Sequence, residues 1–294
     1  MILTNIIENK SLRNIELKEH FNRFDHIFFS IINSKDIFMN DEERILGLMI
    51  FNSCQDSINA IKIGNLNLYN HYLDKIDYYS NKIRHSKVDG INAIIYPMKA
   101  YKYYFEKSID NAINEILIAI KSLINISEEL GKNALGPIIE QYKNLALIYL
   151  TNNNIVACLN IIEFLLNDFI IKDSTSEYLF PIKLKENSLK KHFFNNIIDE
   201  ILMKQYRINP EGFNIFLQSV TKIMSLSSIY KNESVILSNF LSKKCNQNDI
   251  YLVVQSDLPS IVEGNIIREN IEYLNQSEKQ IISDYFTKNY NFTL

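Results

Sequence analysis

The sequence predicts an all-α protein built as a superhelical stack of helical hairpins with helical N- and C-terminal extensions. Hydrophobic residues make up 47% of the 294 residues, which is enough to bury a sizeable core. Only seven glycines and five prolines interrupt the chain, which favours long helices with tight connections. Apolar residues recur at helical spacing in successive segments. We expect a helical N-terminal segment at 1–40, helical hairpins at 41–172 and a less regular helical region at 173–294.

The first predicted hairpin covers residues 41–83. Acidic residues at 41–43 favour a helix start, because the positive end of the helix dipole attracts negative charge. Gly64 is the expected stop, since glycine adopts the left-handed conformation that ends many helices. A second helix follows from Leu66, with apolar positions at Tyr69 and Ile76.

Two further hairpins follow. In the second, a helix rich in Tyr and Phe ends near 107, and Ser108 is the expected N-cap of an isoleucine-rich helix. In the third, Pro137 suits the first turn of a helix, and "TNNN" at 151–154 turns the chain into its partner.

The C-terminal region predicts helices with less regular spacing. Ser188 is the expected cap of one helix, and Pro210 is expected to open the next. The run "IYLVV" at 250–254 predicts a strand, because it is short, apolar and β-branched. Residues 275–286 predict a final capped helix.

The predicted turns recur about every 44–46 residues, and two hairpins share more than their length. Six positions match at identical spacing: Tyr96, Ala100, Tyr103, Ala112, Ile116 and Ala119 against Tyr142, Ala146, Tyr149, Cys158, Ile162 and Leu165. This order of aromatic, small and apolar residues resembles the tetratricopeptide repeat family over roughly 43–170. The chain departs from that family in having no Trp, a longer period, no Pro closing the hairpin and Cys158 in place of Ala.

The resemblance implies that the first helix of each hairpin lines a concave surface that holds a peptide. Carried over to this sequence, the groove positions are Tyr101, Tyr104, Gln141, Lys143 and Asn144. The amides would bind a peptide backbone and Lys143 a carboxylate. A structural interpretation of the rings also stands, in which Tyr103 and Phe105 pack between hairpins while Tyr101 and Tyr104 reach solvent.

The expected function is therefore a non-enzymatic protein- or peptide-binding module that needs no cofactor, with a regulatory role. The chain also resembles bacterial peptide-pheromone receptors, which implies a peptide-responsive transcription regulator, although 1–40 holds no clear DNA-binding motif. A metal-dependent helical-bundle enzyme is the alternative from another class. It would use Glu16, His20 and His26, with further ligands from other helices such as His71 or His85. A structural assembly subunit also stays open.

Charge and composition limit the partners. A net charge of −3 lacks the basic excess of a nucleic-acid-coating protein, and the basic run at 183–192 predicts a solvated helix face. No stretch is apolar enough to predict a membrane span, and Cys54, Cys158 and Cys245 are too scattered for a disulfide framework. We therefore expect a cytoplasmic protein with buried thiols, whose oligomeric state, including a homodimer, the sequence leaves open.

Overall fold

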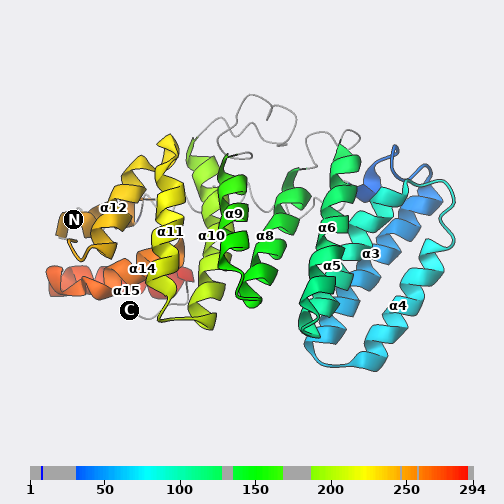
Figure 1. Ribbon diagram of the computed structural model, residues 1–294, viewed down its shortest axis with the longest axis horizontal. Helices are drawn as coiled ribbons and strands as arrows, with labels where there is room; N and C mark the ends of the chain where they lie inside the picture. The colour runs from blue at the N-terminus through cyan, green and yellow to red at the C-terminus, as the bar shows by residue number, and fades with distance from the viewer. Residues whose placement is uncertain are drawn as a thin grey trace. The chain divides into compact units, whose positions relative to one another are not determined.

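A computed structural model describes residues 8, 31–127, 135–167, 187–245, 247–256 and 258–290. Throughout these residues the regular secondary structure is helical, with no strand (Figure 1). The predicted all-α class is therefore confirmed.

The chain forms two compact units, each with its own core. Among the described residues, 31–127 and 135–158 belong to the N-terminal unit, and residue 8, 159–167 and 187–290 belong to the C-terminal unit. The boundary lies between Cys158 and Leu159, whereas the sequence placed a boundary at 172.

The first hairpin consists of α3 (Asp41–Lys62) and α4 (Leu66–Ser80), as predicted. The side chain of Asn40 caps α3 by accepting a hydrogen bond from the Glu43 backbone N–H at 2.9 Å. Gly64 ends the helix in the left-handed conformation, with φ of 71°. The stop that the sequence placed at Gly64 is thus confirmed.

The next helices are α5 (Val88–Phe105), α6 (Ile109–Asn125) and α8 (Leu135–Thr151). After α8 the chain turns into α9 (Ile155–Phe164). Pro97 lies inside α5 and is partly exposed. Proline lacks an N–H, so α5 does without one backbone hydrogen bond at this position.

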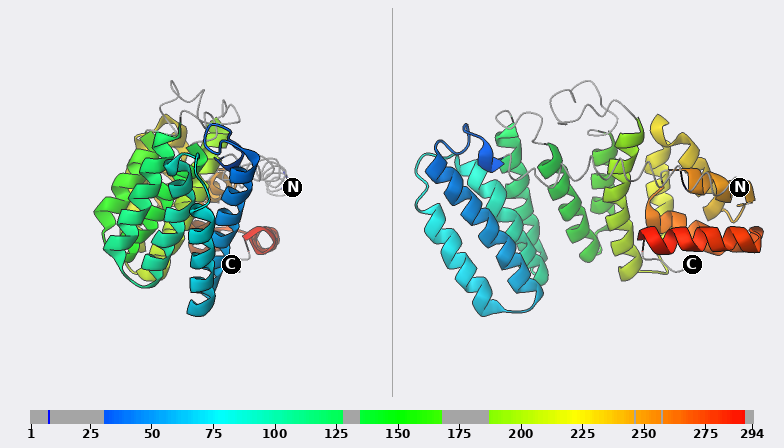
Figure 2. Two further views of the ribbon diagram at one scale, coloured as in Figure 1. Left: turned by 90° about the vertical axis from the view of Figure 1, so that its right-hand side faces the viewer. Right: turned by 180° about the vertical axis from the view of Figure 1, so that it is seen from behind.

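The helices of the N-terminal unit follow one another in the order α4, α3, α5, α6, α8 (Figures 1 and 2). The first two hairpins therefore meet mainly through their first helices, α3 and α5. The next junction is different, because α8 packs mainly against the second helix, α6. A regular repeat would use equivalent contacts at both junctions, so the tetratricopeptide arrangement remains a prediction.

Burial follows the repeated sequence pattern position by position. Within each set of six matched positions, the small and aliphatic members are buried and the tyrosines are partly exposed. Ala146 and Cys158, for example, are 0% exposed, as expected for residues where two helices approach closely. The correspondence that the sequence identified is therefore also a correspondence of environment.

One turn geometry recurs at four helix ends, three of them in the N-terminal unit and one in the C-terminal unit. In each, a residue with positive φ donates its N–H to the carbonyl three residues back. The following N–H then bonds to the carbonyl five residues back at 2.8–2.9 Å, as in a Schellman motif. The positive-φ residues are Gly64 (71°), Lys107 (59°), Asn153 (55°) and Lys243 (55°).

Asparagine side chains cap several helices. Besides Asn40, the Oδ1 atoms of Asn65, Asn154 and Asn275 each accept a backbone N–H three residues on, at 3.0, 3.1 and 3.0 Å. The Glu278 carboxylate in turn accepts a hydrogen bond from the Asn275 backbone N–H at 3.0 Å, which completes a capping box for the final helix. Ser108 occupies the N-cap of α6 as predicted, but its hydroxyl oxygen accepts from a side chain and caps no backbone N–H.

Besides the last residues of α9, the described part of the C-terminal unit contains six longer helices and two short 3-10 turns. In chain order these are α10 (Asn187–Ile208), α11 (Phe213–Ser225), η4 (Ser228–Tyr230), α12 (Lys231–Leu241), α13 (Gln247–Gln255), α14 (Ser260–Glu269), η5 (Ile271–Tyr273) and α15 (Gln276–Tyr290). The predicted final helix at 275–286 is confirmed by α15.

Three local predictions for this unit are wrong. Ser188 was expected to cap a helix, but it lies inside α10, which begins at Asn187. Residues 250–254 lie in α13, where Ile250, Val253 and Val254 are buried on one face while Leu252 points outward. A short apolar run is compatible with a strand or with a buried helix face. Burial at positions i, i+3 and i+4 is the pattern of a helix. Pro210 does not open α11, which begins at Phe213 after a turn held by an Asn209 side chain.

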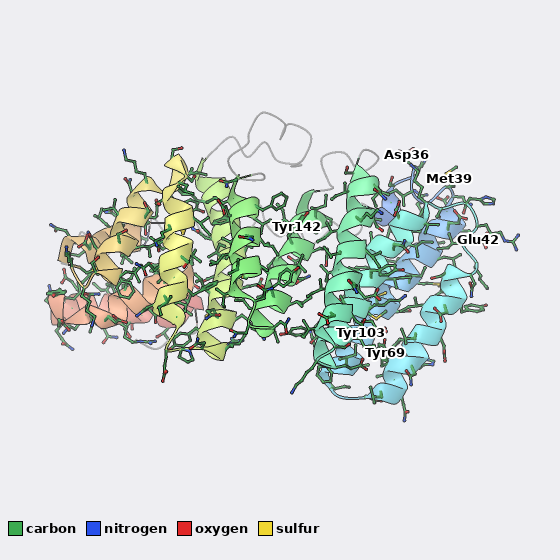
Figure 3. All side chains as sticks on the ribbon, viewed as in Figure 1. Asp36, Met39, Glu42, Tyr69, Tyr103 and Tyr142 are labelled. Atoms are coloured by element: carbon green, nitrogen blue, oxygen red, sulfur yellow. The ribbon has the colours of Figure 1, made fainter. Side chains whose placement is uncertain are left out.

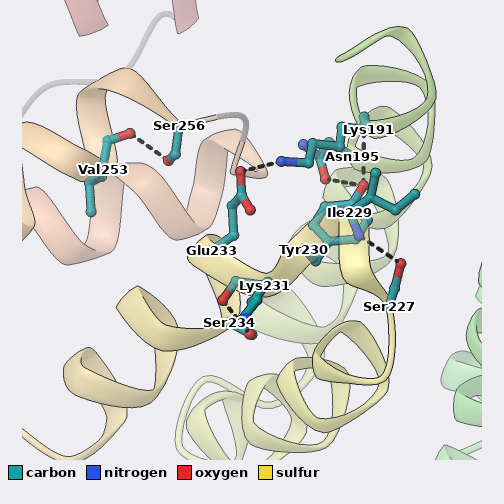
Figure 4. Close-up of polar contacts among 10 residues, drawn as sticks. All are labelled: Lys191, Asn195, Ser227, Ile229, Tyr230, Lys231, Glu233, Ser234, Val253 and Ser256. Atoms are coloured by element: carbon teal, nitrogen blue, oxygen red, sulfur yellow. Dashed lines mark hydrogen bonds and ion pairs between the residues drawn. The ribbon is translucent and has the colours of Figure 1, made fainter. Parts of the chain in front are cut away.

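A polar network is buried between α10, η4 and α12 (Figure 4). Lys191 Nζ lies 2.7 Å from Glu233 Oε1, and the Tyr230 hydroxyl lies 3.1 Å from both the Lys191 carbonyl and Asn195 Oδ1. Glu233 is 5% exposed, and its second carboxylate oxygen has no hydrogen-bond partner in the described part of the chain. The network ties together segments that are far apart in sequence.

Candidate functional site

The candidate site lies where α3 and α5 end and α4 begins. It consists of Lys62 from α3, Tyr69 from α4, and Tyr101, Lys102, Tyr103 and Tyr104 from α5, which we call the tyrosine–lysine surface. Figure 3 shows Tyr69 and Tyr103 at the same end of the N-terminal unit. Because α3 and α5 pack against each other and Lys62 lies over the Tyr101 ring, the last turns of the two helices lie side by side.

Tyr101 and Tyr104 stand one turn apart on α5. Their ring centroids are 6.4 Å apart, and Lys62 Nζ lies 5.8 Å from the centroid of Tyr101. The Tyr104 hydroxyl lies 3.0 Å from Thr151 Oγ1 at the end of α8. The pair of rings therefore connects the ends of three helices, α3, α5 and α8.

Lys102 occupies the other side of the surface. Its Nζ lies 5.8 Å from the ring centroid of Tyr69 and 5.2 Å from that of Tyr103. The same ammonium lies 3.5 Å from Glu106 Oε2. Tyr69 is only 3% exposed, so its ring is a fixed support, while the Lys102 side chain keeps 30% of its surface exposed. Contacts of an ammonium with ring faces hold the charge in place without neutralising it.

Two phenols of this surface, Tyr69 and Tyr101, stay protonated at neutral pH because burial raises their pKa. Burial raises the pKa of Tyr69 to about 12, and the negative charge of Glu106 adds to the effect. Burial also raises the pKa of Tyr101, with a smaller contribution from Tyr104. Groups of this kind donate hydrogen bonds and present rings, and they supply no base or nucleophile.

The other three predicted groove residues lie elsewhere on α8. Gln141 is 2% exposed and Lys143 is 7% exposed, so the chain itself covers both side chains. Lys143 Nζ pairs with Glu140 Oε1 at 2.8 Å, and Asn144 donates to Gln141 Oε1 at 3.3 Å. At about 1.5 Å per residue, Gln141 lies about 15 Å along the helix from the α8 end that contacts Tyr104.

The structure therefore brings together two of the five predicted residues, Tyr101 and Tyr104, and both are partly exposed. A groove role for Gln141, Lys143 and Asn144 stays a prediction. Lys62 and Lys102 are candidate site residues that the sequence did not predict. The signal that could have found them is their position just before the two predicted turns, at Gly64 and at 107–108.

The structural interpretation of the rings is partly wrong. Phe105 was expected to pack between hairpins, but it is 51% exposed. It is the last residue of α5, where the neighbouring helices end as well and offer no surface to cover it. Tyr103 and the two candidate tyrosines are all partly exposed.

The metal-site alternative falls mostly outside the described residues, since Glu16, His20 and His26 all lie there. Of the two additional histidines, His85 donates its backbone N–H to Glu43, and His71 packs its ring 5.6 Å from that of Tyr72. In the described ranges no three His, Cys, Asp or Glu side chains gather as metal ligands would. That alternative thus stays a prediction.

The three cysteines are free and buried, as predicted. Burial raises the pKa of Cys54 and Cys158 to about 12 and that of Cys245 to about 11. Thiols with such pKa values carry almost no thiolate at neutral pH and are poor nucleophiles.

Of the basic run at 183–192, the structure describes the side chain of Lys191, which is partly exposed and paired with Glu233 inside the C-terminal unit. The prediction that this run forms a solvated helix face is therefore wrong for Lys191, whose ammonium is paired inside the unit. Its ammonium pairs with Glu233 and so links α10 to α12.

None of the helices in the described ranges has the length and apolar character needed to cross a bilayer. Comparison of the chain with family models, curated proteins and solved structures gives no match. The tetratricopeptide resemblance therefore depends on the repeated residues and on their matching burial.

Proposed function

We propose that this chain is a non-enzymatic binding module and that the tyrosine–lysine surface is where it holds a protein or peptide partner. The observation that supports this most directly is the pairing of Tyr101 with Tyr104 across the ends of three helices. Both rings are fixed by contacts within the unit and yet remain partly open to solvent.

Tyrosine suits this role physically. It offers a large apolar ring with few rotatable bonds and a hydroxyl that accepts and donates, so binding loses little side-chain entropy. A partner's apolar side chain could pack on the exposed ring edges, while its backbone bonds to the phenols. Binding surfaces commonly depend on a few such aromatic anchors.

The test uses selection, because the partner is unidentified. A displayed library of random peptides is panned against the full chain, and enriched peptides are measured by fluorescence anisotropy. We expect Tyr101→Ala/Tyr104→Ala to weaken binding at least about tenfold, as loss of aromatic anchors commonly does. Circular dichroism should show unchanged helicity, because neither ring is fully buried.

Tyr78→Ala is the matched control. Tyr78 is 57% exposed on α4, and Lys82 Nζ lies 4.2 Å from its ring centroid, so it reproduces a Tyr–Lys contact outside the proposed surface. Binding should survive this change. Equal affinity for the wild type and the double variant, or a library that yields no binder, would refute the proposal.

Two narrower functions depend on residues 1–40 and are kept as proposals. A peptide-responsive regulator would add specific DNA binding to the peptide surface, which a selection of random DNA duplexes would detect. A metal-dependent enzyme would retain stoichiometric iron, manganese or zinc after purification, and elemental analysis of the full chain would show it.

A further inference from the structure

We infer that the segment held by the tyrosine–lysine surface is acidic, with carboxylates that pair with Lys62 and Lys102 and an apolar side chain that packs on Tyr101 and Tyr104. This inference rests on the proposed function and adds the chemistry of the ligand to it. It follows from the state of the lysines at the ends of α3 and α5.

Uncompensated positive charge gathers at these helix ends. Neither Lys62 nor Lys107 makes an ion pair with any described residue, and both are exposed. Lys102 has one carboxylate nearby, Glu106, at 3.5 Å. Of the two lysines on the surface, Lys62 thus has no carboxylate partner among the described residues and Lys102 has one, so a ligand that brings carboxylates is electrostatically complementary.

Lysines in the last turn of a helix often serve to hydrogen-bond its final carbonyl groups. Here the turn backbone already does so. The carbonyls of Ala60 and Tyr103 accept from the backbone N–H groups of Asn65 and Ser108, at 2.9 and 2.8 Å. The ammonium of Lys62 is therefore not required as a cap.

The ring contacts also place the ammonium groups for pairing. Lys62 lies over Tyr101, and Lys102 lies over Tyr69 and Tyr103, at 5.2–5.8 Å from the ring centroids. A cation held against a ring face still has N–H groups that point away from the ring. A carboxylate can approach there and form a charge-assisted hydrogen bond.

A single-stranded nucleic acid is the other anionic polymer to weigh, and the same geometry disfavours it. Proteins that bind single strands stack bases on open aromatic faces. Here lysines cover a face of Tyr69, Tyr101 and Tyr103. The chain as a whole also carries a net charge of −3, which repels phosphates at long range.

The test compares two synthetic peptides of equal length, in which phenylalanines are spaced among glutamates or among glutamines. A uridine oligonucleotide is the third probe, and all three are titrated with the full chain by fluorescence anisotropy. We expect the glutamate peptide to bind at least tenfold more tightly than the glutamine peptide at low salt. The difference should shrink as salt is added, because exposed charges are screened.

Variants then separate the inference from the function on which it rests. Lys62→Gln/Lys102→Gln should remove the preference for glutamate without weakening the glutamine peptide, and the control Lys82→Gln should keep it. If the glutamate and glutamine peptides bind equally well, and both lose binding in Tyr101→Ala/Tyr104→Ala, the inference of an acidic ligand is wrong. The proposed function would still hold.

Two further outcomes overturn the inference. Tighter binding of the oligonucleotide than of the glutamate peptide, weakened by the lysine changes, would assign the surface to nucleic acid. Failure of the glutamate peptide to bind at all would reject an acidic segment, and the library selection would then decide the proposed function independently.

Discussion

Each unit contains a buried carboxylate that bonds to backbone N–H groups far away in the sequence, and the pKa values of the two are shifted in opposite directions. In the N-terminal unit, Glu43 accepts the backbone N–H groups of Arg84 and His85 at 2.9 and 2.8 Å, just before α5. In the C-terminal unit, Asp199 accepts the Ile261 N–H at 3.0 Å and the Ser260 hydroxyl at the start of α14.

The pKa of each group reports the balance between desolvation and hydrogen bonding. Burial opposes ionisation of Glu43, but the two N–H groups and the Ser86 hydroxyl outweigh it, so its pKa is lowered. Burial dominates at Asp199, and its pKa is raised despite the bonds to Ser260 and Ile261. A buried carboxylate therefore favours its charged form only when the groups that donate hydrogen bonds to it compensate for the lost water.

The largest expected effect tests a third buried carboxylate, Glu233, whose donor is an ammonium. Lys191→Met would leave this carboxylate buried without its counter-ion, so we expect a loss of about 3–5 kcal/mol in the free energy of unfolding. Urea unfolding followed by circular dichroism measures it. The exposed Lys222→Met is the matched control in the same unit.

A compensating change checks the cause. Glu233→Leu added to Lys191→Met removes the stranded charge, so most of the lost stability should return. A double variant as unstable as the single one would show that packing, and not the buried charge, holds α10 against α12.

An intermediate effect is expected at Glu43. Its folded-state pKa is lowered, so the stabilisation is present above the unfolded pKa of about 4.3 and is lost as pH falls through the folded pKa. Glu43→Gln should cost about 2 kcal/mol at pH 7, the usual size for hydrogen bonds to a charged group. Unfolding free energies measured from neutral to acidic pH should show the two proteins converging at low pH.

Asp199 provides a contrast, because its effect on stability should depend on pH in the opposite direction to that of Glu43. Its raised pKa means that wild-type stability relative to Asp199→Asn should fall as pH rises through the folded pKa. Glu42→Gln, at an exposed position beside Glu43, is the neutral control. If the difference in unfolding free energy between the wild type and Glu43→Gln did not change with pH, hydrogen bonding would not outweigh desolvation at Glu43.

The smallest expected effect compares the same turn in the two units. Lys107 and Lys243 hold φ of 59° and 55°, a conformation that costs a side-chain-bearing residue more than glycine. Lys107→Gly and Lys243→Gly should each stabilise by about 0.5–1 kcal/mol. Gly64→Ala should destabilise by a similar amount through the backbone alone, since no atom lies within 4 Å of the added Cβ. Thermal unfolding of each variant would show whether the turns are energetically equivalent.

The sequence was most informative where structure depends on near neighbours. Helix starts after Asn40 and helix ends at Gly64 depend on residues within a few positions, and both were read correctly. Residues 250–254 were misread because a run of five apolar residues fits a strand or one buried helix face, and the packing partners that decide between them are distant in sequence.

The candidate site was only half predictable for the same reason. Tyr101 and Tyr104 follow from their spacing on one helix, whereas the placement of Lys62 over Tyr101 depends on how α3 packs against α5. Gln141 was assigned to an open face by the family pattern. Its burial shows that the neighbours of α8 decide which face is covered, and spacing along the chain does not contain that information.

The recurring positive-φ turn has a consequence for how such a chain can grow. Gly64, Lys107 and Asn153 lie 43 and 46 residues apart, and Lys243 lies 90 residues beyond Asn153. Each of these turns ends one helix through the same pair of backbone bonds, and after the first three the next helix begins within two residues. An insertion or deletion between two of these turns therefore leaves the backbone bonds of the turns on either side unchanged, whereas the helix packing, which differs from junction to junction, has to adjust.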